Sequence, residues 1–142
     1  MKQEISVSWK DGMSFEADVD GHKIVLDAAE KAGGRNLGPR PKALMLVALA
    51  GCTAMDVISL LAKMRIELDN FDVKVEGTHC EEQPKYFKSM HIVYEFWGKD
   101  LPNEKLEKAI DLSLERYCGV YAVYKKVMPV TYSIITHPAL NK

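Results

Sequence analysis

The stretch that decides the fold runs from residue 43 to residue 62 and reads Ala43-Leu44-Met45-Leu46-Val47-Ala48-Leu49-Ala50-Gly51-Cys52-Thr53-Ala54-Met55-Asp56-Val57-Ile58-Ser59-Leu60-Leu61-Ala62. Nearly every side chain in it is apolar, and Asp56 is its only charged residue. Pro41 stands just before it, where a proline opens a helix without losing a needed hydrogen bond. The stretch therefore predicts one long helix that ends near Arg65.

This apolar helix has two interpretations, because its length also suffices to cross a bilayer. A helix that is apolar all round is otherwise the central helix of a soluble fold, buried on every side. We favour the buried helix, since Asp56 interrupts the run and the sequence holds no second segment of this kind. A domain this small cannot surround such a helix alone, so a second subunit is expected to cover part of it.

Length and charge narrow the class of protein. The 142 residues predict a single domain that spans residues 1–142. The 19 lysines and arginines nearly balance the 20 aspartates and glutamates, which leaves a net charge of −1. This charge balance does not favour nucleic acid as a partner, and the lack of a basic run argues against an anionic membrane surface.

The N-terminal residues alternate in polarity like a strand and lack the apolar core of a signal peptide. We therefore expect a cytoplasmic protein. Three cysteines cannot all pair within one chain, and in that compartment they are expected to be free, structural or catalytic.

The remaining elements follow from alternation and helical spacing. Residues 5–9, 13–19 and 23–26 read as a meander of three strands, with turns at Asp11-Gly12 and Asp20-Gly21. Residues 32–39 are rich in glycine, but no phosphate-binding motif follows, so we interpret them as a plain loop.

Residues 71–76 and 89–96 also alternate between apolar and polar side chains, which predicts an antiparallel hairpin with one solvent-exposed face. Matching the apolar faces places Val75 opposite Ile92 and Val73 opposite Tyr94.

Two helices and a last strand complete the order. Asn103 is expected to cap a helix that reaches Tyr117, and Cys118-Gly119 separates it from a short helix over residues 120–127. Residues 131–136 form the last strand. The order β-β-β-α-β-β-α-α-β indicates an α+β domain.

Cys52 lies in the apolar helix, where a free cysteine most often packs as a small hydrophobe. A reactive Cys52 would need a thiolate, which its apolar neighbours and the carboxylate of Asp56 disfavour. It therefore requires a cation from elsewhere, or a helix N-terminus, which Gly51 would supply by breaking the helix. Both interpretations stay open at this point.

Cys118 and Cys80 have weaker local signals. If a helix starts at Cys118, its dipole is expected to lower the pKa of that thiol, whereas the alternative is a buried residue that closes a turn. Cys80 falls beside Glu81 and Glu82, where negative charge disfavours a thiolate, so we interpret it as incidental.

The sequence predicts no metal and no cofactor, since it contains neither CxxC nor HExxH. In the hairpin register His91 stands opposite Glu76, which indicates a surface charge pair. His22 and His137 have no visible partner.

Two motifs resemble the OsmC/Ohr family. One is the stretch Gly38-Pro39-Arg40-Pro41 with the Ala/Leu-rich run and Ala50-Gly51-Cys52-Thr53-Ala54-Met55-Asp56-Val57; the other is Glu115-Arg116-Tyr117-Cys118-Gly119-Val120. The order of elements matches as well, so the resemblance covers nearly the whole chain.

The resemblance implies an intertwined homodimer with the long helices at its middle and the active sites at the interface. It implies that Cys52 attacks an organic hydroperoxide and becomes a sulfenic acid, which Cys118 converts to a disulfide. A cellular dithiol would then reduce the pair. An apolar site would favour alkyl and lipid hydroperoxides.

One departure concerns the cation that activates the first cysteine. Characterised members carry a glutamate after the helix-opening proline, where it positions an arginine, and Lys42 occupies that position here. Arg35 and Arg40 are the candidates for the cation. The rival hypothesis is an OsmC-fold dimer that binds an apolar ligand in the interfacial pocket without turnover.

Overall fold

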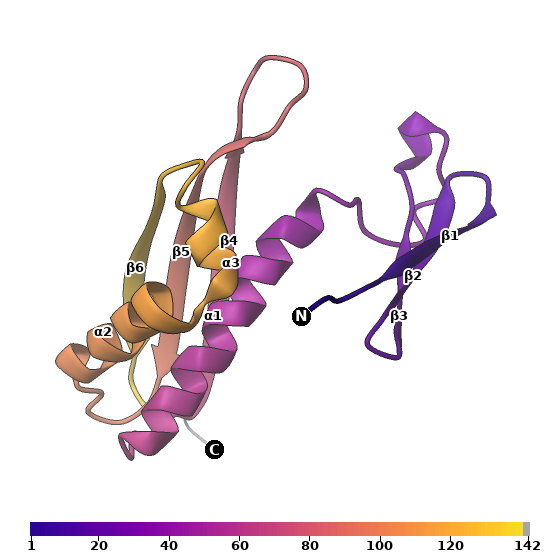
Figure 1. Cartoon of the computed structure of the whole chain (residues 1–142). Helices are drawn as coiled ribbons and strands as arrows, with labels where there is room; N and C mark the ends of the chain where they lie inside the picture. The colour runs from indigo at the N-terminus through magenta and orange to yellow at the C-terminus, as the bar shows by residue number, and fades with distance from the viewer. Residues whose placement is uncertain (141–142) are drawn as a thin grey trace. The chain divides into compact units, whose positions relative to one another are not determined.

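The computed structural model describes residues 1–140, which form two compact units, Met1–Met45 and the part of the chain that follows from Leu46 (Figure 1). The boundary falls within helix α1 (Ala43–Lys63). Each unit is described by itself, and the prediction of one domain over the whole chain stays a prediction.

The N-terminal unit contains the predicted meander. Strands β1 (Ser6–Asp11), β2 (Ser14–Val19) and β3 (His22–Leu26) form an antiparallel sheet in the order β1-β2-β3. Gly12 and Gly21 have positive φ values of 56° and 82°, as the tight turns between these strands require. The two turn signals in the sequence are thereby confirmed.

Asp27 organises the loop that follows β3. Its carboxylate accepts hydrogen bonds from the backbone amides of Ala28 (2.7 Å), Arg35 (3.1 Å) and Leu37 (3.2 Å). The loop contains the short 3₁₀ helix η1 (Glu30–Ala32). The glycines in this loop have a structural explanation, because a Cβ on Gly34 would lie 2.0 Å from the carbonyl oxygen of Ala28.

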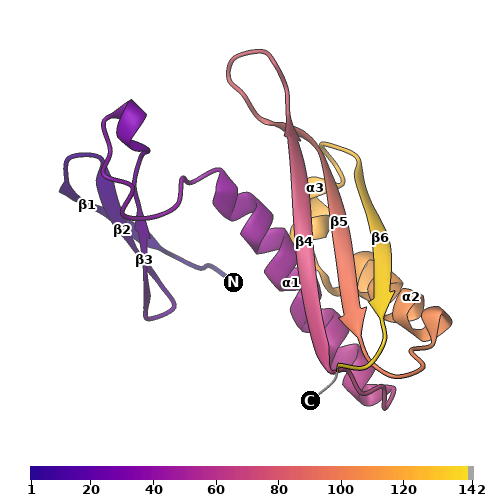
Figure 2. The same cartoon turned by 180° about the vertical axis from the view of Figure 1, so that it is seen from behind.

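The second unit holds a mixed sheet in the order β4-β5-β6, which Figure 2 shows from its open side. Strands β4 (Asn70–His79) and β5 (Phe87–Trp97) are antiparallel, whereas β6 (Val130–His137) runs parallel to β5. Val75 pairs with Ile92 and Val73 pairs with Tyr94, so the predicted register is confirmed.

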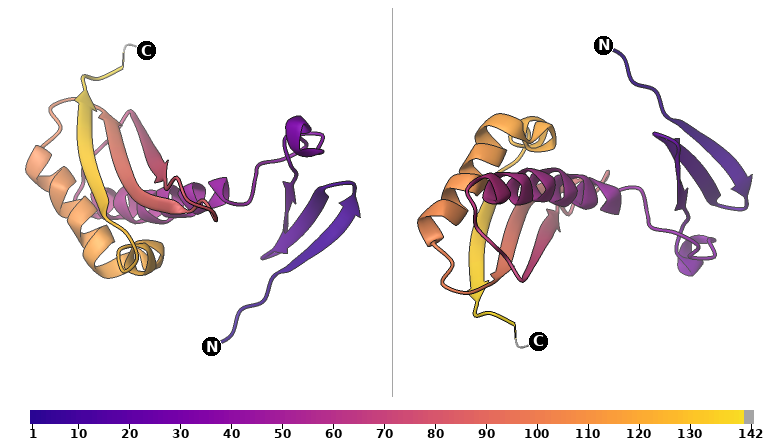
Figure 3. Two further views of the ribbon diagram at one scale, coloured as in Figure 1. Left: turned by 90° about the horizontal axis from the view of Figure 1, so that it is seen from above. Right: turned by 90° about the horizontal axis from the view of Figure 1, so that it is seen from below.

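Helices cover one face of this sheet. Helices α1 and α2 (Asn103–Leu112) lie against the same face (Figure 3), and α2 continues through a π-helical turn η2 (Ser113–Tyr117) to α3 (Gly119–Tyr124). Between helices and sheet lies a core of apolar residues that includes Leu49, Val57, Leu61, Ile92, Tyr94, Phe96, Leu106, Ala109 and Ile110.

Helix α1 buries one stripe of its surface in the single chain, made of Leu49, Thr53, Val57 and Leu61. These residues recur every four positions and face the sheet. On the opposite side, Val47 and Met55 are 61% and 74% exposed. The helix is long and apolar enough to cross a membrane by length and composition, as core helices of soluble proteins also are.

One open alternative is excluded, and two local predictions were wrong. Gly51 does not break α1, which is continuous through the whole stretch. Pro102 occupies the N-cap of α2, with φ −81° and ψ 106°, so Asn103 is already the first helical residue. His137 does have a partner, because its Nε2 lies 2.6 Å from a carboxylate oxygen of Glu95.

His91 stands opposite Glu76 as predicted, but it forms no charge pair there. Its two ring nitrogens are hydrogen-bonded to Thr131 Oγ1 (2.7 Å) and Ser133 Oγ (3.0 Å) on the neighbouring strand β6. The parallel pairing of β5 and β6, which alternation alone does not predict, brings these hydroxyls within reach.

Candidate active site

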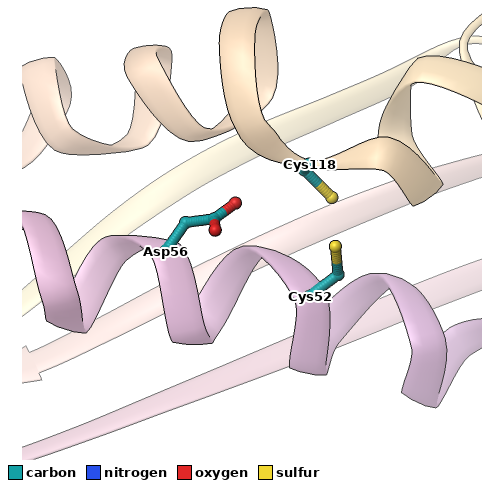
Figure 4. A group of neighbouring side chains, drawn as sticks. All are labelled: Cys52, Asp56 and Cys118. Atoms are coloured by element: carbon teal, nitrogen blue, oxygen red, sulfur yellow. The ribbon is translucent and has the colours of Figure 1, made fainter.

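Cys52 and Cys118 come from distant parts of the sequence and face each other across the gap between α1 and the α2–α3 junction (Figure 4). Their sulfur atoms and a carboxylate oxygen of Asp56 all lie within 4.8 Å of one another. Cys52 is half-buried, and Cys118 is 2% exposed. The structure thus brings together the two cysteines that the sequence singled out, and adds an acidic neighbour.

Helix geometry places Cys52 and Asp56. They are four residues apart on the continuous helix α1, so their side chains lie on one face, one turn apart. Their neighbours Thr53 and Val57 belong to the buried stripe of that helix. Both functional groups therefore lie at the edge of the core, close to the segment that carries Cys118.

The π-helical turn η2 places Cys118. The amide of Cys118 donates to the carbonyl of Ser113, five residues back, at 2.7 Å. Cys118 then leaves the helical conformation and serves as the N-cap of α3, where its sulfur accepts a hydrogen bond from the amide of Tyr121 at 3.4 Å. Single π turns inside helices are frequent at functional sites.

Burial raises the pKa of the Cys118 thiol to about 11. The amides of Tyr121 and Val120 act in the opposite direction, whereas a hydrogen bond with the Cys52 thiol raises the pKa further. Of the two alternatives that the sequence left open for Cys118, the structure favours the buried residue, because α3 has only six residues and desolvation outweighs the effect of its N-terminus on the pKa. At neutral pH Cys118 is a protonated thiol.

A buried network of hydroxyl groups lies directly beside the cysteines. Thr53 Oγ1 is 2.8 Å from both Tyr94 Oη and Ser113 Oγ, and Ser113 donates to Asp56 Oδ2 at 2.9 Å. Thr53, Tyr94 and Ser113 are fully buried. The network therefore ties α1, β5 and η2 to one another and fixes the carboxylate beside the two sulfurs.

This network was missed in the sequence. A polar residue within an apolar face is the signal that marks each member: Thr53 on α1, Tyr94 on the inward face of β5 and Ser113 among the apolar positions of α2 and η2. Each of these residues alone is common in a core. Only the fold shows that the three signals belong to one cluster.

Arg35 and Arg40 lie in the N-terminal unit. Arg35 forms an ion pair of 3.5 Å with Asp11, and Arg40 donates to Asn36 Oδ1 (2.7 Å) and to the carbonyl of Gly38 (2.8 Å). Both guanidinium groups thus have local partners that orient them. Their role toward Cys52 stays a prediction.

Cys80 lies just beyond β4, in the loop before β5. Its thiol is directed at the carbonyls of Glu82 and Pro84, and its sulfur accepts a hydrogen bond from the amide of Tyr86 at 3.4 Å. It therefore closes this loop and takes no part in the Cys52–Cys118 site.

The N-terminal unit contains an apolar cavity of about 540 Å³. Its walls are almost entirely hydrocarbon, and the residues that line it include Val7, Met13, Phe15, Leu26, Ala28 and Ala32. Asp27 and Arg40 are the charged residues among those that line it. A cavity of this size and lining suits a small apolar molecule.

Comparison with known proteins decides the family. A model of the OsmC-like protein family matches residues 33–133, a range that contains both cysteines of the site. The chain belongs to the OsmC family. Protein YhfA of Escherichia coli (strain K12) is 33% identical to this OsmC-like chain over 130 residues, which cover 89% of the chain and 92% of YhfA.

Two solved structures share the OsmC fold with this chain. A protein from Aquifex aeolicus VF5 is 25% identical, with a TM-score of 0.80 over 96% of this chain and 98% of its own. The organic hydroperoxide resistance protein OsmC of Legionella pneumophila is 17% identical, with a TM-score of 0.69 over 95% and 97% of the two chains. The second likeness shows the fold alone. The α+β fold and the family predicted from the sequence are thus confirmed.

Proposed function

We propose that this OsmC-like protein reduces organic hydroperoxides, with Cys52 as the attacking thiol and Cys118 as the resolving thiol. The observation that carries the proposal is the approach of the two sulfurs, which lie within 4.8 Å of each other although their residues are far apart in the sequence. A free thiol pair at this distance needs only small side-chain movements to form a disulfide.

The reaction has three balanced steps. The Cys52 thiolate attacks the outer oxygen of the hydroperoxide, the O–O bond breaks, and the products are a Cys52 sulfenic acid and an alcohol once the alkoxide takes up a proton. Cys118 then attacks the sulfenic sulfur, and water leaves as the disulfide forms. A cellular dithiol reduces the disulfide back to two thiols and is itself oxidised.

The environments of the two thiols support this division of roles. Cys52 is half-buried and therefore more accessible to a substrate than Cys118, which is 2% exposed. The raised pKa of Cys118 keeps it protonated until the sulfenic acid is present. Asp56, held by Ser113, has a carboxylate oxygen within 4.8 Å of the Cys118 sulfur and can accept its proton as the disulfide forms.

The working unit in this proposal is a cytoplasmic homodimer that takes apolar hydroperoxides. The exposed apolar side of α1, with Val47 and Met55, supports a second copy as its cover. Arg35 or Arg40 supplies the cation that favours the Cys52 thiolate. The Legionella protein, which shares this fold, is named an organic hydroperoxide resistance protein, and that name supports the proposed substrate class.

Mass spectrometry of the reduced protein after one equivalent of an alkyl hydroperoxide tests this function. The wild type should give a Cys52–Cys118 disulfide, and Cys118→Ser should hold a sulfenic acid on Cys52 that excess oxidant converts to sulfinic acid. Cys52→Ser should consume no peroxide above background, while Cys80→Ser should behave as the wild type does. A wild type that reacts no faster than free cysteine would contradict the enzyme.

The second candidate is a dimeric module that binds an apolar ligand without turnover. The observation that favours it is the hydrocarbon-lined cavity of about 540 Å³ in the N-terminal unit. Binding of a fluorescent fatty acid that is lost in Phe15→Asp, with no peroxide consumption in either protein, would favour this module over the enzyme.

A further inference from the structure

We propose that the reduced form of Cys52 and Cys118, together with Asp56, binds a thiophilic divalent cation such as Zn²⁺. Three donor atoms of the kinds that Zn²⁺ accepts, two thiol sulfurs and one carboxylate oxygen, converge within 4.8 Å. With Zn–S bonds of about 2.3 Å, two sulfurs on one tetrahedral ion lie about 4 Å apart. Small rotations of the three side chains therefore suffice to enclose the ion, and water takes the fourth position.

The groups around the three donors are arranged as an outer shell of a metal site requires. Ser113 donates to Asp56 Oδ2 at 2.9 Å and is itself hydrogen-bonded to Thr53, so the carboxylate is held in place beside the two sulfurs. The amide of Tyr121 points at the Cys118 sulfur, where it would stabilise the charge of a bound thiolate. Hydrogen bonds of both kinds orient ligands and tune their basicity.

The charge of the site also favours a cation. Two thiolates and one carboxylate would carry three negative charges within 4.8 Å. In the part of the chain that the structure describes, Asp56 forms no ion pair with a lysine, arginine or histidine. A divalent ion offsets two of these charges, and its binding displaces the two thiol protons into solution.

Metal binding and the proposed peroxide chemistry would exclude each other, although the binding does not depend on that chemistry. A thiolate is the ligand and the nucleophile alike, so a bound ion blocks Cys52 toward peroxide. The disulfide has no thiolate and therefore cannot hold the ion. The bound cation would thus keep the two cysteines reduced and unreactive toward peroxide until the ion is removed.

Titration of the reduced, chelator-treated protein with Co²⁺ under anaerobic conditions tests the proposal. We expect one Co²⁺ per chain, a thiolate-to-cobalt charge-transfer band in the near ultraviolet, and loss of that band when Zn²⁺ displaces the Co²⁺. Cys52→Ser, Cys118→Ser and Asp56→Asn should each weaken binding about 100-fold or more, and Ser113→Ala about 10-fold. Cys80→Ser is the matched control and should bind as the wild type does.

A second measurement removes the dependence on variants that fold poorly. Wild-type protein oxidised to the Cys52–Cys118 disulfide should bind no Co²⁺, and reduction should restore binding. Co²⁺ binding that survives Cys52→Ser or oxidation, or that is lost in Cys80→Ser, would overturn the proposal. The peroxide assay is run with chelator present, so failure of the enzyme and failure of the metal site give separate results.

Discussion

Thr53 Oγ1 lies 2.8 Å from the hydroxyl oxygen of Tyr94, and both side chains are completely buried between α1 and the sheet. Burial raises the pKa of Tyr94 well above its usual range, so this hydroxyl stays protonated. In the described residues no buried side-chain polar atom is left without a hydrogen-bond partner. A change at Thr53 would create such an atom in the centre of the core.

We predict that Thr53→Val lowers the free energy of unfolding by about 1–3 kcal/mol, since it leaves the Tyr94 hydroxyl buried without its partner. Tyr94→Phe is the matched control: it removes the hydroxyl itself, Thr53 keeps its bond to Ser113, and the cost should be about 1 kcal/mol. Urea unfolding with an unchanged m-value measures both. Equal costs for the two variants would speak against the network as a source of stability.

The loop after β3 should depend on the charge of Asp27. Burial alone would raise the pKa of this carboxyl, but hydrogen bonds from the amides of Leu37, Ala28 and Arg35 hold it below its usual value of 3.8. Because the folded pKa is depressed, the stabilisation is present above the unfolded pKa and is lost as the pH falls through the folded one.

We therefore predict that the amide NMR signals of Arg35 and Leu37 shift with a midpoint below pH 3.8, and that their exchange with solvent accelerates below it. Asp27→Asn should remove the pH dependence and show the fast exchange at neutral pH. A midpoint above 3.8 would show that burial outweighs the three hydrogen bonds.

The third prediction concerns the cation of the proposed enzyme. Changing Arg35 and Arg40 together to Ala should slow the reaction of Cys52 with an alkyl hydroperoxide by about fivefold, because an ion pair with the thiolate contributes on the order of 1 kcal/mol. Stopped-flow consumption of peroxide measures the rate. Lys31→Ala, from the same loop, is the control, and an unchanged rate in the double variant would place the cation elsewhere.

The fourth prediction concerns assembly. The side of α1 opposite its buried stripe carries Val47, Gly51, Met55 and Ile58, and a Cβ on Gly51 would meet nothing within 4 Å in the single chain. We expect a stable dimer by light scattering, and Met55→Glu should weaken it at least tenfold, because a charge would be buried against an apolar partner. Leu140→Glu, also at an exposed apolar position, should leave the dimer intact.

Alternation and turn residues sufficed to predict the meander and the hairpin, including the pairing of Val75 with Ile92. A one-residue slip there would turn every apolar side chain to solvent, so the pattern allows one register. The N-cap of α2 was assigned to Asn103, one residue too late, because Pro102, whose φ is fixed, already occupies the cap. Rules based on residue type rank the candidates for a helix cap, but they do not include the backbone conformation of the residues that precede the helix.

The site was harder to predict than the fold. The approach of Cys52 to Cys118 depends on how α2 packs against α1, a contact between segments with no shared periodicity. The residues alone left the roles of both cysteines undecided, and only the family resemblance implied that they form a pair. From the sequence, Asp56 was interpreted only as an interruption of an apolar helix, since its partner Ser113 is also far away in the sequence.

The π-helical turn before Cys118 holds one residue more than an α-helical turn would. Deleting one residue between Ser113 and Cys118 would let the helix continue as a regular α-helix and rotate the cysteine by about 100° about the axis. Its sulfur would then point away from Cys52, although no residue of the pair had changed. In this protein the meeting of the two cysteines depends on chain length as much as on chemistry, so relatives that differ here by a single insertion or deletion would differ in whether the two thiols can meet.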